Sequence, residues 1–123
     1  MPALAVVLNS IRIDDDNDGW GRGAGDIYIN YNVNDGLNHS SGQLGEYSID
    51  SGETQNLGVT VGVFDDVDTL LSLNVDVWDN DWPDGDDFLG SLNVTYDAWS
   101  NFGIGGHNID VGDFRLNFSI VPV

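Results

Sequence analysis

Apolar and polar residues alternate along most of the chain, and no stretch shows the sustained period of an amphipathic helix. Because successive side chains of a strand point to opposite faces, this pattern predicts an all-β protein whose core is lined by every second residue. The clearest core faces are Leu71, Leu73, Val75 and Val77 in one segment and Phe114, Leu116, Phe118 and Ile120 in another. Eight strands are predicted, at residues 4–13, 27–34, 43–50, 55–64, 70–78, 88–96, 106–109 and 114–121.

Clusters of Gly, Asn and Asp separate these segments at the spacing of an antiparallel β-sandwich, and no change of composition indicates a linker. We therefore expect residues 1–123 to form a single domain, as the length of the chain also suggests. If consecutive strands run antiparallel, the two most acidic loops emerge at the same end of the sandwich. Four loops share that end, namely 14–26, 51–54, 79–87 and 110–113.

The chain is strongly acidic, with 21 Asp and Glu against three Arg and no Lys, so its formal net charge is -18. This balance excludes nucleic acid as a partner, because phosphate binding depends on clustered Lys and Arg. An anionic membrane is excluded too, unless a bound metal bridges the two surfaces. All the acids except Glu46 and Glu53 are aspartates. This bias favours calcium sites and turns over the general acidity of a salt-adapted protein, which stays an alternative.

The segment from Val77 to Gly90 holds five carboxylates and no cation. Neighbouring carboxylates a few Å apart repel each other by about 1 kcal/mol in water, so a bound cation would stabilise the loop. Calcium is the best candidate, because this hard ion takes six to eight oxygen ligands from Asp, Asn and backbone carbonyls. Asp79 and Asp81 alternate along an extended backbone and share one side, and Asp87 follows after a short turn.

A second acidic loop opens with Asp14, Asp16 and Asp18 at alternate positions, followed by Gly19, as an EF-hand loop does. The match ends there, because Gly25 occupies the twelfth position and neither flank is helical. The EF-hand fold is therefore rejected, and the alternative for this loop alone is a solvated turn. Two such loops at one end of a sandwich predict a cup that binds calcium.

Three stretches of the sequence resemble the C2 domain family. Residues 71–90 look like its third-loop pattern, in which an alternating strand ends in Asp-x-Asp and a further Asp precedes two apolar residues and Gly. Residues 25–29 look like the segment that closes its first loop, although Ile27 replaces the family's proline, and residues 113–122 resemble its closing strand. No Lys-rich strand is present, so the family's polyphosphoinositide-binding patch is missing.

The resemblance implies an eight-stranded antiparallel β-sandwich, in the family variant whose first strand leads directly into calcium loop one. It also implies two or more calcium ions, with Asp26, Asp79, Asp81 and Asp87 as ligands. The remaining first-loop ligand does not align uniquely and is assigned without preference to Asp14, Asp16 or Asp18.

We expect a non-enzymatic protein, since the chain has no Cys and no zinc-like His pattern. Carboxylate pairs such as Asp86 and Asp87 could do acid and base chemistry only in a cleft, which a small sandwich seldom provides. The first expectation is an extracellular structural, adhesive or self-assembling module that calcium stabilises. Calcium-dependent binding to phospholipid is the alternative, and a third is a carbohydrate-binding module that uses Trp20 or Trp82. Residues 2–8 do not form a recognisable signal peptide, so the extracellular or cell-surface location is inferred from the millimolar calcium that weak sites need.

Overall fold

The computed structural model describes residues 2–14, 25–81 and 85–123, and it confirms the predicted all-β fold. Eight strands and one short 3-10 helix follow one another along the chain. The elements are β1 (Leu4–Ile13), β2 (Gly25–Asn34), β3 (His39–Ile49), β4 (Thr54–Phe64), β5 (Leu70–Asp81), β6 (Gly85–Asp97), η1 (Ala98–Gly103), β7 (Gly105–Asp110) and β8 (Phe114–Pro122). Every strand pair is antiparallel.

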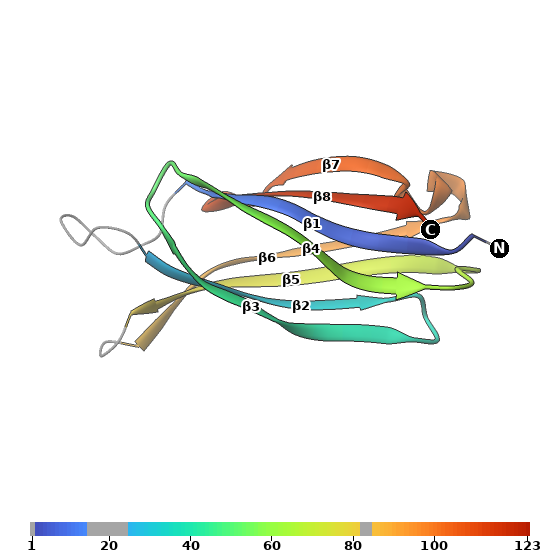
Figure 1. The fold of residues 1–123 in the computed structure, drawn as a ribbon, viewed down its shortest axis with the longest axis horizontal. Helices are drawn as coiled ribbons and strands as arrows, with labels where there is room; N and C mark the ends of the chain where they lie inside the picture. The colour runs from blue at the N-terminus through green and yellow to red at the C-terminus, as the bar shows by residue number, and fades with distance from the viewer. Residues whose placement is uncertain (1, 15–24, 82–84) are drawn as a thin grey trace.

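The strands form two four-stranded sheets, with the orders β4-β1-β8-β7 and β3-β2-β5-β6 (Figure 1). Both predicted core faces, on β5 and on β8, are buried between the sheets. The first and last strands meet at one end, where the Val123 N–H donates to the Ala3 carbonyl at 2.9 Å. Figure 1 shows β5 and β6 reaching the opposite end of the sandwich, where β2 begins.

The strands at this far end are longer than the sequence predicted, which corrects the position of the third loop. β5 continues to Asp81 and β6 begins at Gly85, so Asp79, Asp81 and Asp87 are strand residues instead of members of a loop 79–87. The pairs Asp79 with Asp87, Asn80 with Asp86 and Asp81 with Gly85 continue the ladder. Backbone pairing extends here through polar positions, which carry no hydrophobic signal in the sequence.

A bulge in β6 explains the two apolar residues and Gly that follow Asp87. Trp78 pairs with Phe88 and Val77 pairs with Gly90, so Leu89 is the extra residue. Leu89 is buried, whereas Phe88 on the outer face is 50% exposed. Gly90 has φ +148°, and a β-carbon there would lie 3.3 Å from the side chains of Phe114 and Val111. The bulge thus turns Leu89 into the core, and only glycine fits the space beside it.

Candidate calcium site

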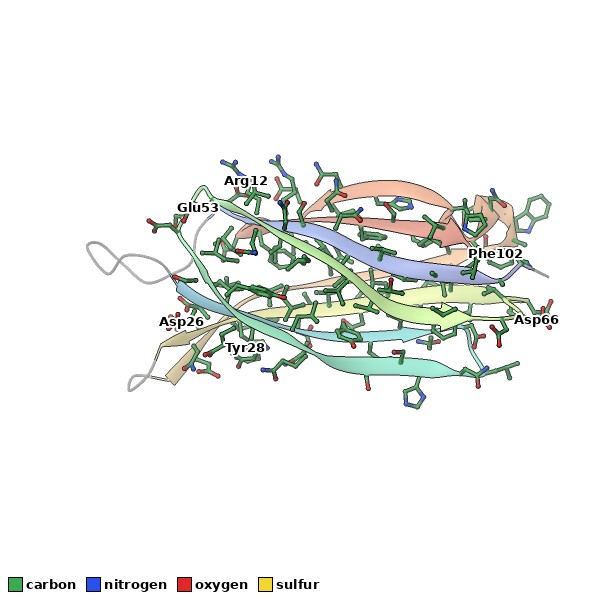
Figure 2. All side chains as sticks on the ribbon, in the orientation of Figure 1. Arg12, Asp26, Tyr28, Glu53, Asp66 and Phe102 are labelled. Atoms are coloured by element: carbon green, nitrogen blue, oxygen red, sulfur yellow. The ribbon has the colours of Figure 1, made fainter. Side chains whose placement is uncertain are left out.

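The flanks of the acidic loops meet at one end of the sandwich, as the sequence predicted. The Asp14 N–H donates to the Asp113 carbonyl at 2.8 Å, and the Gly52 N–H donates to the Ile13 carbonyl at 2.6 Å. The strands that flank the first and third loops are joined by a hydrogen bond from the Asp26 N–H at the start of β2 to Asp79 Oδ1 near the end of β5, at 3.0 Å. Figure 2 shows Asp26, Glu53 and Arg12 at this end, with Asp66 and Phe102 at the other.

Asp79 is the central residue of the site, because its side chain is completely buried. It follows Val77 on the inward face of β5, and the next strand places Ile27 opposite it. Its carboxylate packs against the backbone at the start of β2, where a β-carbon on Gly25 would lie 3.0 Å from Asp79 Oδ2. The lack of a side chain at Gly25 therefore leaves space for the Asp79 carboxylate at this end of the core.

The second acidic strand brings another carboxylate to this position. Asp87 on β6 pairs directly with Asp79 and is half-buried. Side chains that face each other across antiparallel strands have β-carbons about 5 Å apart, and like charges in such a pair destabilise the sheet. The pair thus carries two energetic costs, the burial of charge and the repulsion between the two carboxylates. A cation between the carboxylates lowers both costs.

The other predicted ligands have different surroundings. Asp26 is exposed at the beginning of β2, and Asp14 is half-buried beyond the end of β1. Asp14 Oδ1 lies 3.0 Å from Arg12 Nε, so its charge is partly compensated within the protein. Asp16, Asp18 and the Asp81 side chain are outside the described part of the chain. Within residues 2–14, 25–81 and 85–123, no three His, Cys, Asp or Glu side chains are grouped closely enough to hold a metal alone.

The outer face of the same hairpin carries a hydrogen-bonded network that the sequence analysis missed. The Tyr28 hydroxyl donates to Asp86 Oδ2 at 2.5 Å, and the Asn80 amide donates to Glu46 Oε2 at 2.7 Å. Desolvation, the hydrogen bond to Asp86, and the charges of Asp86 and Glu46 raise the pKa of Tyr28 to about 12. Period-two alternation could have separated Asp86 from Asp87, because adjacent strand residues face opposite sides.

Aromatic rings cover this outer face. The rings of Tyr28 and Trp78 are parallel within 5° with centroids 6.4 Å apart, and the Trp78 and Phe88 centroids are 4.9 Å apart. The fifth carboxylate of the hairpin, Asp84, is outside the described residues, as are Trp20 and Trp82. The acidic hairpin therefore has a carboxylate face toward the core and an aromatic face toward solvent.

No family model matches the sequence, and no curated protein matches it. Solved structures do match its fold. A human GIVD cytosolic phospholipase A2, in complex with an inhibitor and terbium chloride, has a TM-score of 0.62 at 13% identity over 98% of this chain and 17% of that chain. Drosophila C2-DSL-EGF1 has a TM-score of 0.59 at 12% identity over 99% of this chain and 67% of that one.

A structure of two C2 domains of Extended-Synaptotagmin 2 matches with a TM-score of 0.54 at 20% identity, over 98% of this chain and 41% of that chain. The chain spans less than a fifth of the phospholipase that it matches. At these identities the likeness concerns the fold alone. The sandwich defines this protein as an all-β module with a C2-like fold, in agreement with the resemblance of its third-loop residues. No helix among the described residues is long and apolar enough to span a membrane.

Proposed function

We propose that this chain is a non-catalytic module that binds calcium at the end formed by the flanks of its first and third loops, and that binds anionic phospholipid through the ion. The observation that carries the proposal is Asp79, a fully buried carboxylate placed directly opposite Asp87. A buried carboxylate that faces a second, half-buried carboxylate is costly, and a cation between the two lowers this cost.

The donors at this position suit calcium better than a transition metal. Asp79 and Asp87 offer carboxylate oxygens from facing positions of two neighbouring strands. Calcium binds such hard oxygen donors in a flexible geometry, whereas zinc favours Cys and His, and the chain has no Cys. When bound, calcium supplies positive charge and accepts further oxygens from outside the protein.

The aromatic surface beside the site supports phospholipid as the external partner, and the charge of the protein makes such attachment depend on the metal. With a net charge of -18 the protein repels an anionic surface, so attachment would depend on the metal at this end. The adjacent outer face presents Phe88, which is half-exposed, beside Trp78 and Tyr28. Aromatic side chains of this kind partition into the membrane interface. The C2-like neighbours, a phospholipase among them, are consistent with this reading.

Vesicle sedimentation tests the proposal directly. We expect mixed phosphatidylserine and phosphatidylcholine vesicles to bind the parent protein at millimolar calcium and to release it when calcium is chelated. The double variant Asp79→Asn, Asp87→Asn should not bind. Asp76→Asn is a control on the outer face of the same strand, since it also removes a carboxylate charge. Vesicles that bind parent and double variant equally would overturn the proposal.

The same experiment separates the structural module from the lipid binder. Calcium binding by Asp79 and Asp87 stabilises the fold in both cases, because a ligand that binds only the native state raises its free energy of unfolding. A protein that gains stability with calcium but ignores anionic vesicles would instead be the extracellular structural or assembly module that we expected first from the sequence. Its location outside the cell would then follow from the calcium concentration that it needs.

A further inference from the structure

Positive charge is rare in this protein, which has three Arg and no Lys. The two arginines in the described part of the chain lie next to each other. Arg12 on β1 and Arg115 on β8 are directly opposite each other in the sheet. The third arginine, Arg22, lies outside the described residues. Figure 2 shows Arg12 on the side of its sheet that faces away from the second sheet, near the acidic end. Like charges at opposite positions repel, so this arrangement is stabilised by negative charge close to the pair.

A shallow cavity of about 260 Å³ lies between these side chains. The register of the sheet explains its shape, because Arg12 pairs with Thr54 on one side and with Arg115 on the other. The neighbouring row is formed by Ser10 on β1, Asn117 on β8 and Asn108 on β7. Asn117 pairs with Ser10 on one side and with Asn108 on the other. All six lining residues carry a hydrogen-bond donor: Ser10, Arg12, Thr54, Asn108, Arg115 and Asn117.

Two carboxylates flank the cavity and reduce its positive potential. Asp14 Oδ1 lies 3.0 Å from Arg12 Nε, and Asp110 Oδ2 lies 3.4 Å from one terminal nitrogen of Arg115. Each of these contacts engages one nitrogen of a guanidinium that carries five N–H donors. The arginine side chains are also 45% and 42% exposed, so solvent and ligands reach them.

We propose that this cavity, the arginine pocket, binds a tetrahedral oxyanion, namely a phosphate or sulfate group. Two facing guanidinium groups suit such an anion because each can donate paired N–H groups to its oxygens. The hydroxyl and amide donors of the second row surround the same space and would complete the coordination. A neutral ligand would form weaker hydrogen bonds with the same donors.

Asp14 connects this pocket to the calcium site, and this part of the inference rests on the proposed function. Asp14 is both the partner of Arg12 and a candidate first-loop calcium ligand. An ion bound at Asp14 would offset the carboxylate that competes for Arg12, so calcium should strengthen oxyanion binding. By linkage, the oxyanion should strengthen calcium binding by the same factor.

Isothermal titration with phosphate and with sulfate, at constant ionic strength and without calcium, tests the pocket independently of the calcium site. We expect saturable binding in the parent and a loss of at least about tenfold in affinity in Arg115→Gln, because charged hydrogen bonds are removed. Asn93→Asp is the matched control. It makes the same change of one unit in net charge at an exposed position of the other sheet. Absent binding in the parent, or equal losses in both variants, would overturn the proposal.

Four further measurements sharpen the result. Arg115→Lys keeps the charge without the planar fork, so its affinity should lie between those of the parent and Arg115→Gln. Asp14→Asn should raise sulfate affinity severalfold without calcium, and an unchanged affinity would refute the role of Asp14. Binding is also compared between phosphatidic acid vesicles, soluble glycerol phosphate and inorganic phosphate. This comparison distinguishes a lipid headgroup from a free phosphate as the ligand. If calcium leaves the affinity for sulfate unchanged, the coupling between the two sites is wrong, whereas oxyanion binding by the arginine pocket is not affected.

Discussion

Two aspartates are buried at opposite ends of the sandwich, and their surroundings differ. Asp35, which is 6% exposed, follows β2 and accepts N–H groups from Leu37 at 2.9 Å and Asn38 at 2.7 Å. Asp79 is fully buried and has Asp87 opposite it. Both carboxylates accept backbone amides, since Asp79 Oδ1 accepts the Asp26 N–H at 3.0 Å, but the Asp79 charge also faces a second negative charge across the strands. Burial of a carboxylate alone therefore does not indicate a ligand site, and its neighbours decide between a structural and a binding role.

The pKa of Asp35 reflects this local stabilisation. Burial alone would raise the pKa of the Asp35 carboxyl, but hydrogen bonds from the backbone of Asn38 and Leu37 outweigh it and hold the pKa below its ordinary value. The turn thus favours the ionised form without any metal.

The largest effect is expected at Asp79. Calcium at about 100 times its dissociation constant should raise the free energy of unfolding of the parent by about 2.7 kcal/mol. The double variant Asp79→Asn, Asp87→Asn should show almost none of this gain, and in the absence of calcium it should be at least as stable as the parent because the repulsion is removed. Urea unfolding with and without calcium measures both quantities.

A control at the other end completes this test. Calcium should stabilise Asp35→Asn as much as it stabilises the parent, since Asp35 takes no part in the calcium site. A calcium response that depends on Asp35 as strongly as on Asp79 would remove the distinction between the two ends.

An intermediate effect is expected from Asp35→Ala, which should lower the free energy of unfolding by about 2 kcal/mol, with or without calcium, because two hydrogen bonds to a charged acceptor are lost. Asp35→Asn keeps an acceptor oxygen and should lose less. The parent's advantage over Asp35→Ala should be complete above the ordinary pKa of 3.8 and disappear as pH falls through the lower pKa of the folded state. Urea unfolding across this range would show a constant difference if the turn did not stabilise the carboxylate.

The smallest effect is expected at Tyr28, on the outer face of the acidic hairpin. Tyr28→Phe should lower the free energy of unfolding by about 1 kcal/mol at neutral pH, because one hydrogen bond is lost. Since the folded-state pKa is raised from 10.0 to about 12, this contribution is present below pH 10 and is lost as pH rises through 12. Ultraviolet titration should show a tyrosine that ionises near pH 12 in the parent and is missing in the variant. Tyr47→Phe is the control.

The strands and their inward faces could be predicted from the sequence, because burial between two sheets requires alternation. The lengths of β5 and β6 could not, since Asp79 to Asp81 and Gly85 to Asp87 pair through backbone groups alone. Trp99 is 98% exposed, although a side chain of this size usually packs against its neighbours. It projects from η1, where Asp97 and Ser100 form a capping box that stabilises the turn without it.

The sequence indicated part of the candidate site, because Asp-x-Asp at the end of a strand places two carboxylates on one side. The pairing of Asp79 with Asp87 depended on the register of the hairpin, which the sequence did not determine. The arginine pocket was beyond sequence reasoning for a related reason. Arg12 and Arg115 come from the first and last strands, and only the folded sheet shows that they are neighbours.

The pairing of the first strand with the last also affects how the protein folds. β1 lies between β4 and β8, and Asn9 donates a hydrogen bond to Asn117 across 108 residues of chain. The centre of this sheet is therefore incomplete until β8 leaves the ribosome, although the β5–β6 hairpin has already been synthesised. Such non-local topology slows folding to milliseconds or longer. During synthesis, the acidic hairpin thus exists before the sheet that supports it, and the nascent chain has an exposed β1 edge until its last strand arrives.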